Sequence, residues 1–264
     1  MPAELRDVAA LRALPADDLI DAQGKIRGTF GASGGLPFQP VAGGSVLPRQ
    51  PIDVVAEGGA SGIPVMAGSN RHEMRLFTTL DPRMVPADRD AVAALAGKRF
   101  GDRAEALLTA YEAGGASSHQ ELYEALSTDM VFRMPAIQLL DAQRPHAPSY
   151  AYEFHHESTA FGGTLGAAHA VEIPFVFDNL DAGGASFFTG EATTEMRSLA
   201  AAMADAWVAF ARDGAPASDG LPEWPAYDPE RRPTMIFDAE PRVENDPSGP
   251  VRSFWSTADS PGDA

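Results

Sequence analysis

The sequence has no cysteine among its 264 residues. Disulfide bonds, a thiolate nucleophile and cysteine-based metal sites are therefore excluded. No stretch approaches the roughly 20 consecutive apolar residues that span a bilayer, and the opening MPAELRDVAALRALPADD lacks the apolar core of a signal peptide. We expect no membrane association and favour a cytoplasmic location. Secretion stays an open alternative, because the chain need not begin at the natural N-terminus.

Basic residues are few. The chain has 20 Lys and Arg against 37 Asp and Glu, which gives a formal net charge of −17 and a pI near 4.6. Nucleic acids and anionic membranes attract proteins through clustered Lys and Arg, so neither is an expected partner. Hydrophobic residues make up 44% of the chain, enough to build the core of a folded domain.

Short strand-like segments alternate with helical patterns. The pattern predicts strands over 63–68, 149–155 and 234–237, and helices over 91–112, 118–143 and 196–210. This alternation predicts an α/β fold with a partial, mostly parallel sheet and flanking helices. Three or four strands are fewer than the ~5 to 6 of an average sheet. We therefore expect residues 1–264 to be part of a single larger domain.

Two segments lack a clear helical or strand pattern. Residues 24–51 are rich in glycine and proline, which predicts loops with short extended pieces and no helix. Residues 162–180 are predicted to form a loop that carries the apolar string IPFVF. The small polar residues of 256–264 predict a disordered tail.

Glu73 and His169 are the residues whose context best suits catalysis. Glu73 follows the predicted strand 63–68, and functional groups gather at the carboxyl ends of parallel strands. His169 lies in GAAHAVEIPFVF, where small neighbours leave room around the imidazole that a general base needs. Taken singly, each is also explained as a surface side chain. Together they keep the order of acid before histidine that α/β-hydrolases share.

A nucleophilic serine is harder to find. Ser33 occupies the centre of a G-x-S-x-G match over 31–35. A nucleophile elbow needs a hydrophobic strand before the serine and a helix after it. GKIRGTF precedes the match and GLPFQPVAGG follows it, so both requirements fail and Ser33 is not the expected nucleophile.

No metal site or cofactor is expected. His155 and His156 are adjacent, and neighbouring side chains on a strand point to opposite faces, so the two would not converge on one ion. The H-E-x-x-H zinc motif is absent from the sequence.

Several linked strings occur in a fixed order along the chain: PFQPVAGGSVLPRQPIDVVAEG, IPVMAGSNRHEMRLF, TDMVFRMPA, GAAHAVEIPFVFDNL, and AWVAFARDGAP with EWPAYD. Together they resemble the type-B carboxylesterases, most closely the bacterial para-nitrobenzyl esterases and more distantly the cholinesterases. The resemblance runs from about Leu11 to about Asp246. Several motifs in one order are far more specific than any single motif.

The resemblance implies an α/β-hydrolase fold and a serine carboxylesterase that works through an acyl-enzyme. Glu73 matches the family's catalytic acid in the N-R-x-E-G type segment, although Met74 replaces the usual glycine. His169 matches the catalytic histidine before the E-L-P-F-V-F type segment. The family's serine, in a G-E-S-A-G type elbow, and its oxyanion-hole glycines lie upstream of every matched string. The resemblance therefore implies that residues 1–264 are the C-terminal part of a single α/β-hydrolase domain, and a missing N-terminal half would have to supply the serine.

The expected substrate is a small-molecule ester. Phe77, Phe132 and Phe175 are candidates for the walls of its pocket, and each is equally well explained as part of the core. The chain alone is expected to be inactive because it lacks the serine elbow and the oxyanion hole. Two alternatives stay open: a non-catalytic interaction module or inactive fragment of the same fold, and a small enzyme that uses Ser33.

Overall fold

The computed structural model describes residues 8–30 and 40–255, with the side chains of 26–30 left aside. Contacts divide the chain into two units, Met1–Pro51 and Ile52–Ala264. In the first unit lie helices α1 (Val8–Ala13) and α2 (Ala16–Phe30), which are separated at Pro15. Ser33 and the predicted tail 256–264 lie outside the described residues.

A single four-stranded sheet organises the second unit. Its strands are β1 (Val65–Asn70), β2 (Ser149–Phe154), β3 (Pro233–Phe237) and β4 (Arg242–Asn245). They lie in the order β1-β2-β3-β4, with the first three parallel and β4 antiparallel to β3. The predicted α/β class is confirmed. β4 was not predicted, because its charged residues Arg242 and Glu244 form a polar edge strand without apolar alternation.

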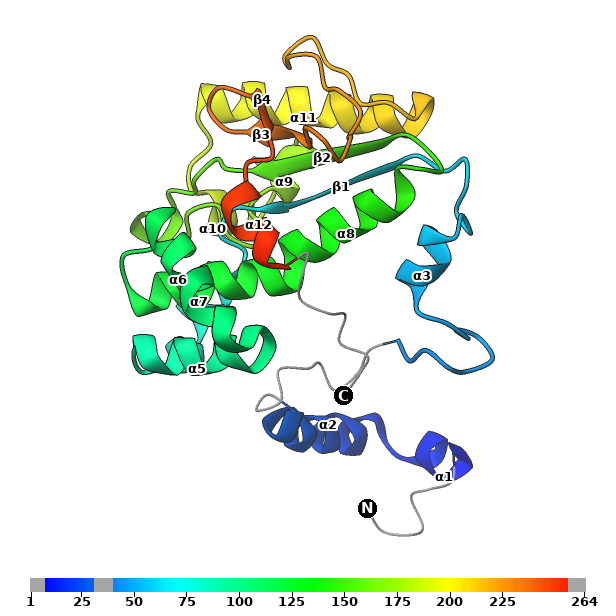
Figure 1. The fold of residues 1–264 in the computed structure, drawn as a ribbon, viewed down its shortest axis with the longest axis vertical. Coiled ribbons are helices and arrows are strands. Elements are labelled where there is room, and N and C mark those ends of the chain that lie inside the picture. The colour runs from blue at the N-terminus through cyan, green and yellow to red at the C-terminus, as the bar shows by residue number, and fades with distance from the viewer. Residues whose placement is uncertain (1–7, 31–39, 256–264) are drawn as a thin grey trace. The chain divides into compact units, whose positions relative to one another are not determined.

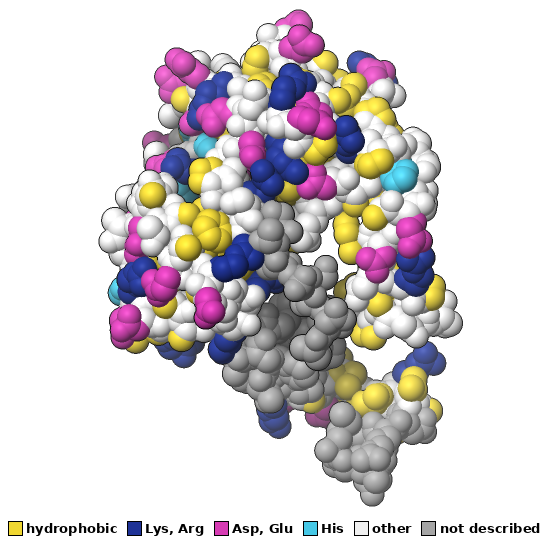
Figure 2. All heavy atoms as spheres, in the orientation of Figure 1, with side chains coloured by type: hydrophobic (Ala, Val, Ile, Leu, Met, Phe, Trp, Pro, Cys, Tyr) yellow, Lys and Arg dark blue, Asp and Glu magenta, His cyan; other side chains and the backbone are white. Residues whose placement is uncertain are grey.

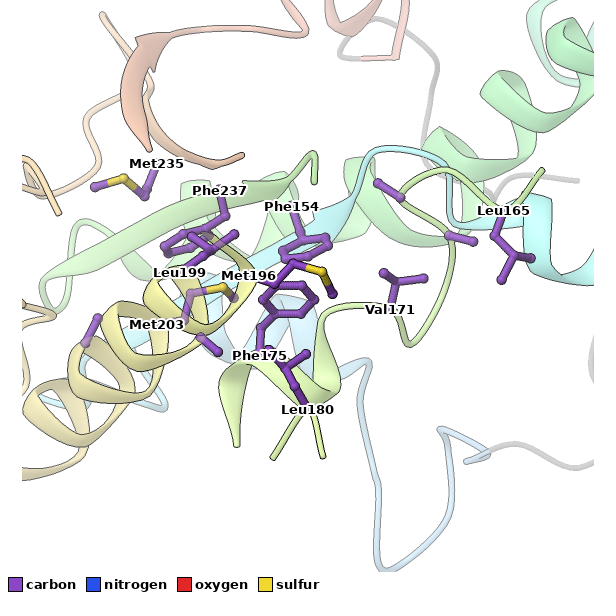
Figure 3. Packing of buried hydrophobic residues seen from close by; sticks show 14 of the residues in the cluster. Phe154, Leu165, Val171, Phe175, Leu180, Met196, Leu199, Met203, Met235 and Phe237 are labelled. Atoms are coloured by element: carbon purple, nitrogen blue, oxygen red, sulfur yellow. The ribbon is translucent and has the colours of Figure 1, made fainter. Parts of the chain in front are cut away.

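Helices cover both faces of this sheet (Figure 1). α8 (Met134–Gln143) packs on one face against β1 and β2, and α11 (Thr194–Asp213) lies on the opposite face. α11 extends the predicted helix 196–210 by a few residues and ends at Gly214, which takes a left-handed φ of 74° at its C-cap. Figure 3 shows Met196, Leu199 and Met203 of α11 facing Phe154, Met235 and Phe237 of the sheet, with Phe175 among them.

A second apolar cluster joins a group of helices beside the sheet. These are α5 (Arg89–Phe100), α6 (Ala104–Ala113), α7 (His119–Thr128) and α12 (Gly249–Trp255), with Met134 of α8. α4 (Met74–Leu80) lies against α7, and its Leu76 belongs to the core cluster under the sheet. The continuous helix predicted over 118–143 is interrupted by a π-helical turn, Asp129–Arg133, between α7 and α8. Such turns are rare and occur often at functional sites.

Short helices occupy parts of the two segments for which no helix was predicted. α2 continues through Gly24 and Gly28 to Phe30, and α3 spans Pro51–Ala56. One glycine costs a helix only about 1 kcal/mol relative to alanine, which is too little to stop it. The predicted loop 162–180 contains α9 (Ile173–Val176), and α10 (Ala185–Thr189) follows it. Short 3-10 helices span Pro82–Met84, Gly101–Arg103 and Ala160–Gly163.

The visible surface carries interspersed charges of both signs. In Figure 2 acidic, basic and apolar side chains alternate over the face shown, without a large basic patch. Among the described residues, no helix is both long enough and apolar enough to cross a membrane.

Candidate active site

Glu73 sits in the turn between β1 and α4, directly beyond the carboxyl end of the strand. The side chain is buried, with only 5% of its surface exposed. Its Oε1 accepts a hydrogen bond from the backbone N of Asn70 at 2.8 Å, and its Oε2 lies 2.7 Å from Nδ1 of His169. The strand end therefore fixes one carboxylate oxygen and directs the other towards the imidazole.

His169 lies in the loop that precedes α9. Its hydrogen bond to Glu73 raises the pKa of the imidazole above its usual 6.5, against the opposing effect of partial burial. With Nδ1 bonded to the carboxylate, the ring presents Nε2 on its other side, and no described residue forms a hydrogen bond with that atom. A histidine oriented through Nδ1, with Nε2 available, has the arrangement of a general base.

Backbone hydrogen bonds join the two loops that carry this pair. The backbone N of His72 donates to the carbonyl of Ala167 at 2.9 Å, and that of His169 donates to the carbonyl of Glu73 at 3.3 Å. In return, the backbone N of Ala167 donates to Nδ1 of His72 at 3.3 Å. Burial, reinforced by Arg75, lowers the pKa of His72 to about 3, so the ring is neutral and can accept this bond. The acid and the histidine are thus assembled within this chain.

The side chain of Asn70 also links these two loops. Its side-chain amide donates to the carbonyl of Ala168 at 2.7 Å and to the carboxylate of Glu172. Burial raises the pKa of Glu172, while the bond from Asn70 acts in the opposite direction. Our reading of the sequence missed Asn70, His72 and Glu172. Their closeness to the predicted pair along the chain was the available signal, but their contacts depend on the pairing of two segments almost 100 residues apart.

Two of the three predicted aromatic residues flank the imidazole. The ring centroids of Phe77 and Phe132 lie 5.3 and 5.2 Å from that of His169, and both side chains are half-buried. Phe175 is placed differently. It is fully buried in the core, where its ring packs 5.1 Å from that of Phe154. Phe175 therefore fills the core, the second of the two roles that the sequence allowed.

The end of α7 and the π-helical turn that follows it both form hydrogen bonds with the Glu73 turn. Arg133 pairs with the buried carboxylates of Asp129 and Glu153, and its Nη2 donates to the carbonyl of Arg71 at 3.2 Å. The hydroxyl of Thr128 accepts from the backbone N of Met74 at 3.2 Å.

Met74, which replaces the glycine usual in the family, is compatible with the backbone conformation at this position. It is the first residue of α4, is itself buried and does not have a positive φ. The turn at this point therefore does not require glycine.

The two adjacent histidines have different surroundings. Nε2 of His155 pairs with Glu153 at 3.0 Å, whereas the ring of His156 packs 5.3 Å from that of Phe175. Within 8–30 and 40–255, no group of three or more His, Asp and Glu side chains is arranged to hold a metal.

The chain is similar to known carboxylesterases. The model of the carboxylesterase family matches residues 2–255. The para-nitrobenzyl esterase of Bacillus subtilis is 35% identical over 221 residues, which cover 82% of this chain and 42% of that protein. The phenmedipham hydrolase of Pseudarthrobacter oxydans is 33% identical over 230 residues, covering 84% of this chain and 45% of that protein.

Solved structures show the same likeness. A carboxylesterase of Geobacillus stearothermophilus superposes with a TM-score of 0.78 at 33% identity, covering 94% of this chain and 50% of that one. The chain spans about half the length of the relatives it matches. On the family match, the sequence identities and the shared α/β-hydrolase fold, the chain belongs to the carboxylesterase family.

Proposed function

We propose that this chain supplies the acid and the histidine of a serine carboxylesterase that hydrolyses small-molecule esters. The observation that carries the proposal is the 2.7 Å contact between Oε2 of Glu73 and Nδ1 of His169, with the carboxylate buried and the imidazole half-exposed. Family membership supports ester hydrolysis as the chemistry.

The proposed mechanism is two-step acyl transfer. Nε2 of His169 takes the proton of a serine hydroxyl while the serine oxygen attacks the ester carbonyl, and His169 then returns the proton to the leaving alcohol. Water, activated by the same nitrogen, releases the acid and restores the serine. Glu73 stabilises the imidazolium, which agrees with the raised pKa of His169. Phe77 and Phe132, whose rings lie next to the imidazole, would line the ester pocket.

We further propose that the serine comes from an N-terminal carboxylesterase half rather than from Ser33. β1 is an end strand of the sheet, so one row of its backbone groups has no partner strand among the described residues. Its apolar residues Val65 and Met66 are only partly buried. A parallel strand added along this edge would extend the sheet and cover them. By itself the chain would then have no esterase turnover. The cysteine-free, acidic composition favours a cytoplasmic location for the assembled enzyme.

Hydrolysis of p-nitrophenyl acetate, combined with fluorophosphonate labelling, tests the proposal. The chain alone should neither turn over the ester nor take the label. Co-expression with the N-terminal half of the Bacillus subtilis para-nitrobenzyl esterase, or fusion to it, should restore turnover and place the label on that half.

Matched histidine variants complete the experiment. In the assembled protein, His169→Ala should lower kcat about 10⁶-fold. His119→Ala, which alters an exposed histidine on α7, should leave kcat unchanged. Label on Ser33 of the chain alone would show that the small enzyme is the correct interpretation. Turnover that survives His169→Ala would refute the assigned base, and no turnover in any assembly would favour a non-catalytic module.

A further inference from the structure

A small cavity lies between α8 and the sheet, next to β1, the strand that ends at the Glu73 turn. Its volume is about 30 Å³. Apolar residues of α8, such as Ile137 and Leu140, form one side, and polar side chains of the sheet and of neighbouring segments form the other. The polar lining includes Ser69, Arg133, Glu153, Thr234 and Ser248. This cavity is separate from the surface around His169, which does not line it.

Two lining residues each carry a buried polar atom that forms no hydrogen bond with any described residue. These atoms are Oγ of Ser69 and Nε of Arg133. Ser69 is 4% exposed and lies directly across from Glu153 in the register of β1 and β2. Nε of Arg133 lies 3.4 Å from Oε1 of Glu153, but their geometry does not make a hydrogen bond. A buried polar group without a hydrogen-bond partner destabilises the folded state by about 1 to 3 kcal/mol. Because two such atoms belong to residues that line the same cavity, a shared ligand would satisfy both.

The surrounding charges select the kind of ligand. Arg133 is paired with two carboxylates, Asp129 and Glu153. Burial alone would raise the pKa of Glu153, but Arg133 and His155 outweigh it and lower the pKa to about 2, so Glu153 is ionised. An anion would add repulsion to this cluster. A metal ion would need more ligands than are arranged to hold one within the described residues.

We propose that the cavity binds one or two ordered water molecules that connect Ser69 to Arg133 and Glu153. A buried water needs about 10 to 15 Å³ of accessible space and two to four polar partners, and this cavity supplies both. Water can accept from Nε of Arg133, donate to the Glu153 carboxylate and bond to the Ser69 hydroxyl in either sense.

The bound water gives the Glu73 turn a second anchor. Ser69 immediately precedes Asn70, whose backbone N holds Oε1 of Glu73. Arg133, on the other side of the cavity, holds the carbonyl of Arg71. Water that links Ser69 to Arg133 therefore connects both ends of the short segment that leads into the acid. This inference does not depend on the proposed esterase activity.

Two substitutions at one position distinguish a hydrated from a dry cavity. Ser69→Ala and Ser69→Val both remove the hydroxyl, but valine also fills the space, and a valine suits a β-strand. If the cavity holds water, the valine side chain displaces the water that bonds to Arg133. The urea concentration at the unfolding midpoint of Ser69→Val should then be lower than that of Ser69→Ala. In a dry cavity valine fills a void, so its midpoint should rise above that of Ser69→Ala and of the wild type.

A crystal structure of the wild-type chain gives the direct observation. Electron density for water within hydrogen-bond distance of both Ser69 Oγ and Arg133 Nε is the expected result. An empty cavity, or a midpoint for Ser69→Val at or above that of Ser69→Ala, would overturn the proposal.

Discussion

Gly166 is the position where one added methyl group should most clearly disturb the candidate site. It has a φ of +55°, which L-residues with side chains rarely adopt. A Cβ at this position would lie 2.7 Å from Nδ1 of His72 and 2.8 Å from Nη1 of Arg75. The neighbouring residue, Ala167, donates its backbone hydrogen bond to that same nitrogen of His72. Gly166→Ala should therefore strain the backbone and push apart the loops that carry Glu73 and His169.

The expected cost has two parts. A left-handed conformation costs a non-glycine residue about 1 to 2 kcal/mol. Overpacking that forces neighbours to shift adds about 1 to 3 kcal/mol. Gly166→Ala should thus lower the free energy of unfolding by about 2 to 5 kcal/mol. Gly162→Ala is the matched control, since Gly162 has a φ of +68° in the same loop but open space around its Cβ position. Only the backbone part, about 1 to 2 kcal/mol, should apply there.

Urea denaturation of the two variants and the wild type at neutral pH measures the difference. We expect Gly166→Ala to be less stable than Gly162→Ala by about 1 to 3 kcal/mol, the overpacking part alone. Equal losses in the two variants would refute the argument, because they would show that the contact with His72 and Arg75 has no energetic effect.

Three further predictions concern the same region. Burial lowers the pKa of His72 to about 3, so only the unfolded state takes up a proton on this ring as the pH falls below 6.5. Urea denaturation should therefore show the free energy of unfolding decreasing by up to ~1.4 kcal/mol per pH unit from this group as the pH falls. His72→Gln, which keeps an acceptor, should weaken this pH dependence, and an unchanged dependence would contradict the prediction. Ala170 has a φ of 69°, so Ala170→Gly should gain roughly 0.5 to 1 kcal/mol, and a lower melting temperature would contradict this. Phe175→Ala should cost about 3 to 5 kcal/mol and Phe132→Ala clearly less, because only Phe175 is fully buried; equal losses would argue against their placement.

The sequence was sufficient to predict the parts of the fold that depend on local pattern. The short apolar run before Glu73 became β1, the aromatic segment 149–155 became β2, and the stripe from Met196 to Phe210 became α11. Glu73 and His169 were predicted as partners from chain order and family resemblance, and the structure brings them into contact. Local hydrophobic patterns and the order of motifs are properties of the amino-acid sequence alone, so neither requires knowledge of tertiary contacts.

What the sequence did not predict depends on tertiary contacts. The π-helical turn at Asp129–Arg133 has no periodic signature of its own, and it brings Phe132 beside His169. Phe175 and Phe132 are the same residue type in similarly apolar strings, yet one fills the core and the other faces the imidazole. The roles of Asn70 and His72 arise from hydrogen bonds to a loop almost 100 residues later, which no local pattern encodes.

The central claim is that Glu73 holds His169 as an acid–base pair within this chain, and an NMR titration of the His169 imidazole tests it most directly. In the wild type the pKa should lie above 6.5, because the Glu73 carboxylate favours the imidazolium. Glu73→Gln removes the charge and leaves the partial burial, so the pKa of His169 should fall. Glu105→Gln, which removes a charge from the exposed end of α6, should leave it unchanged. A His169 pKa that is the same in the wild type and in Glu73→Gln would contradict the account.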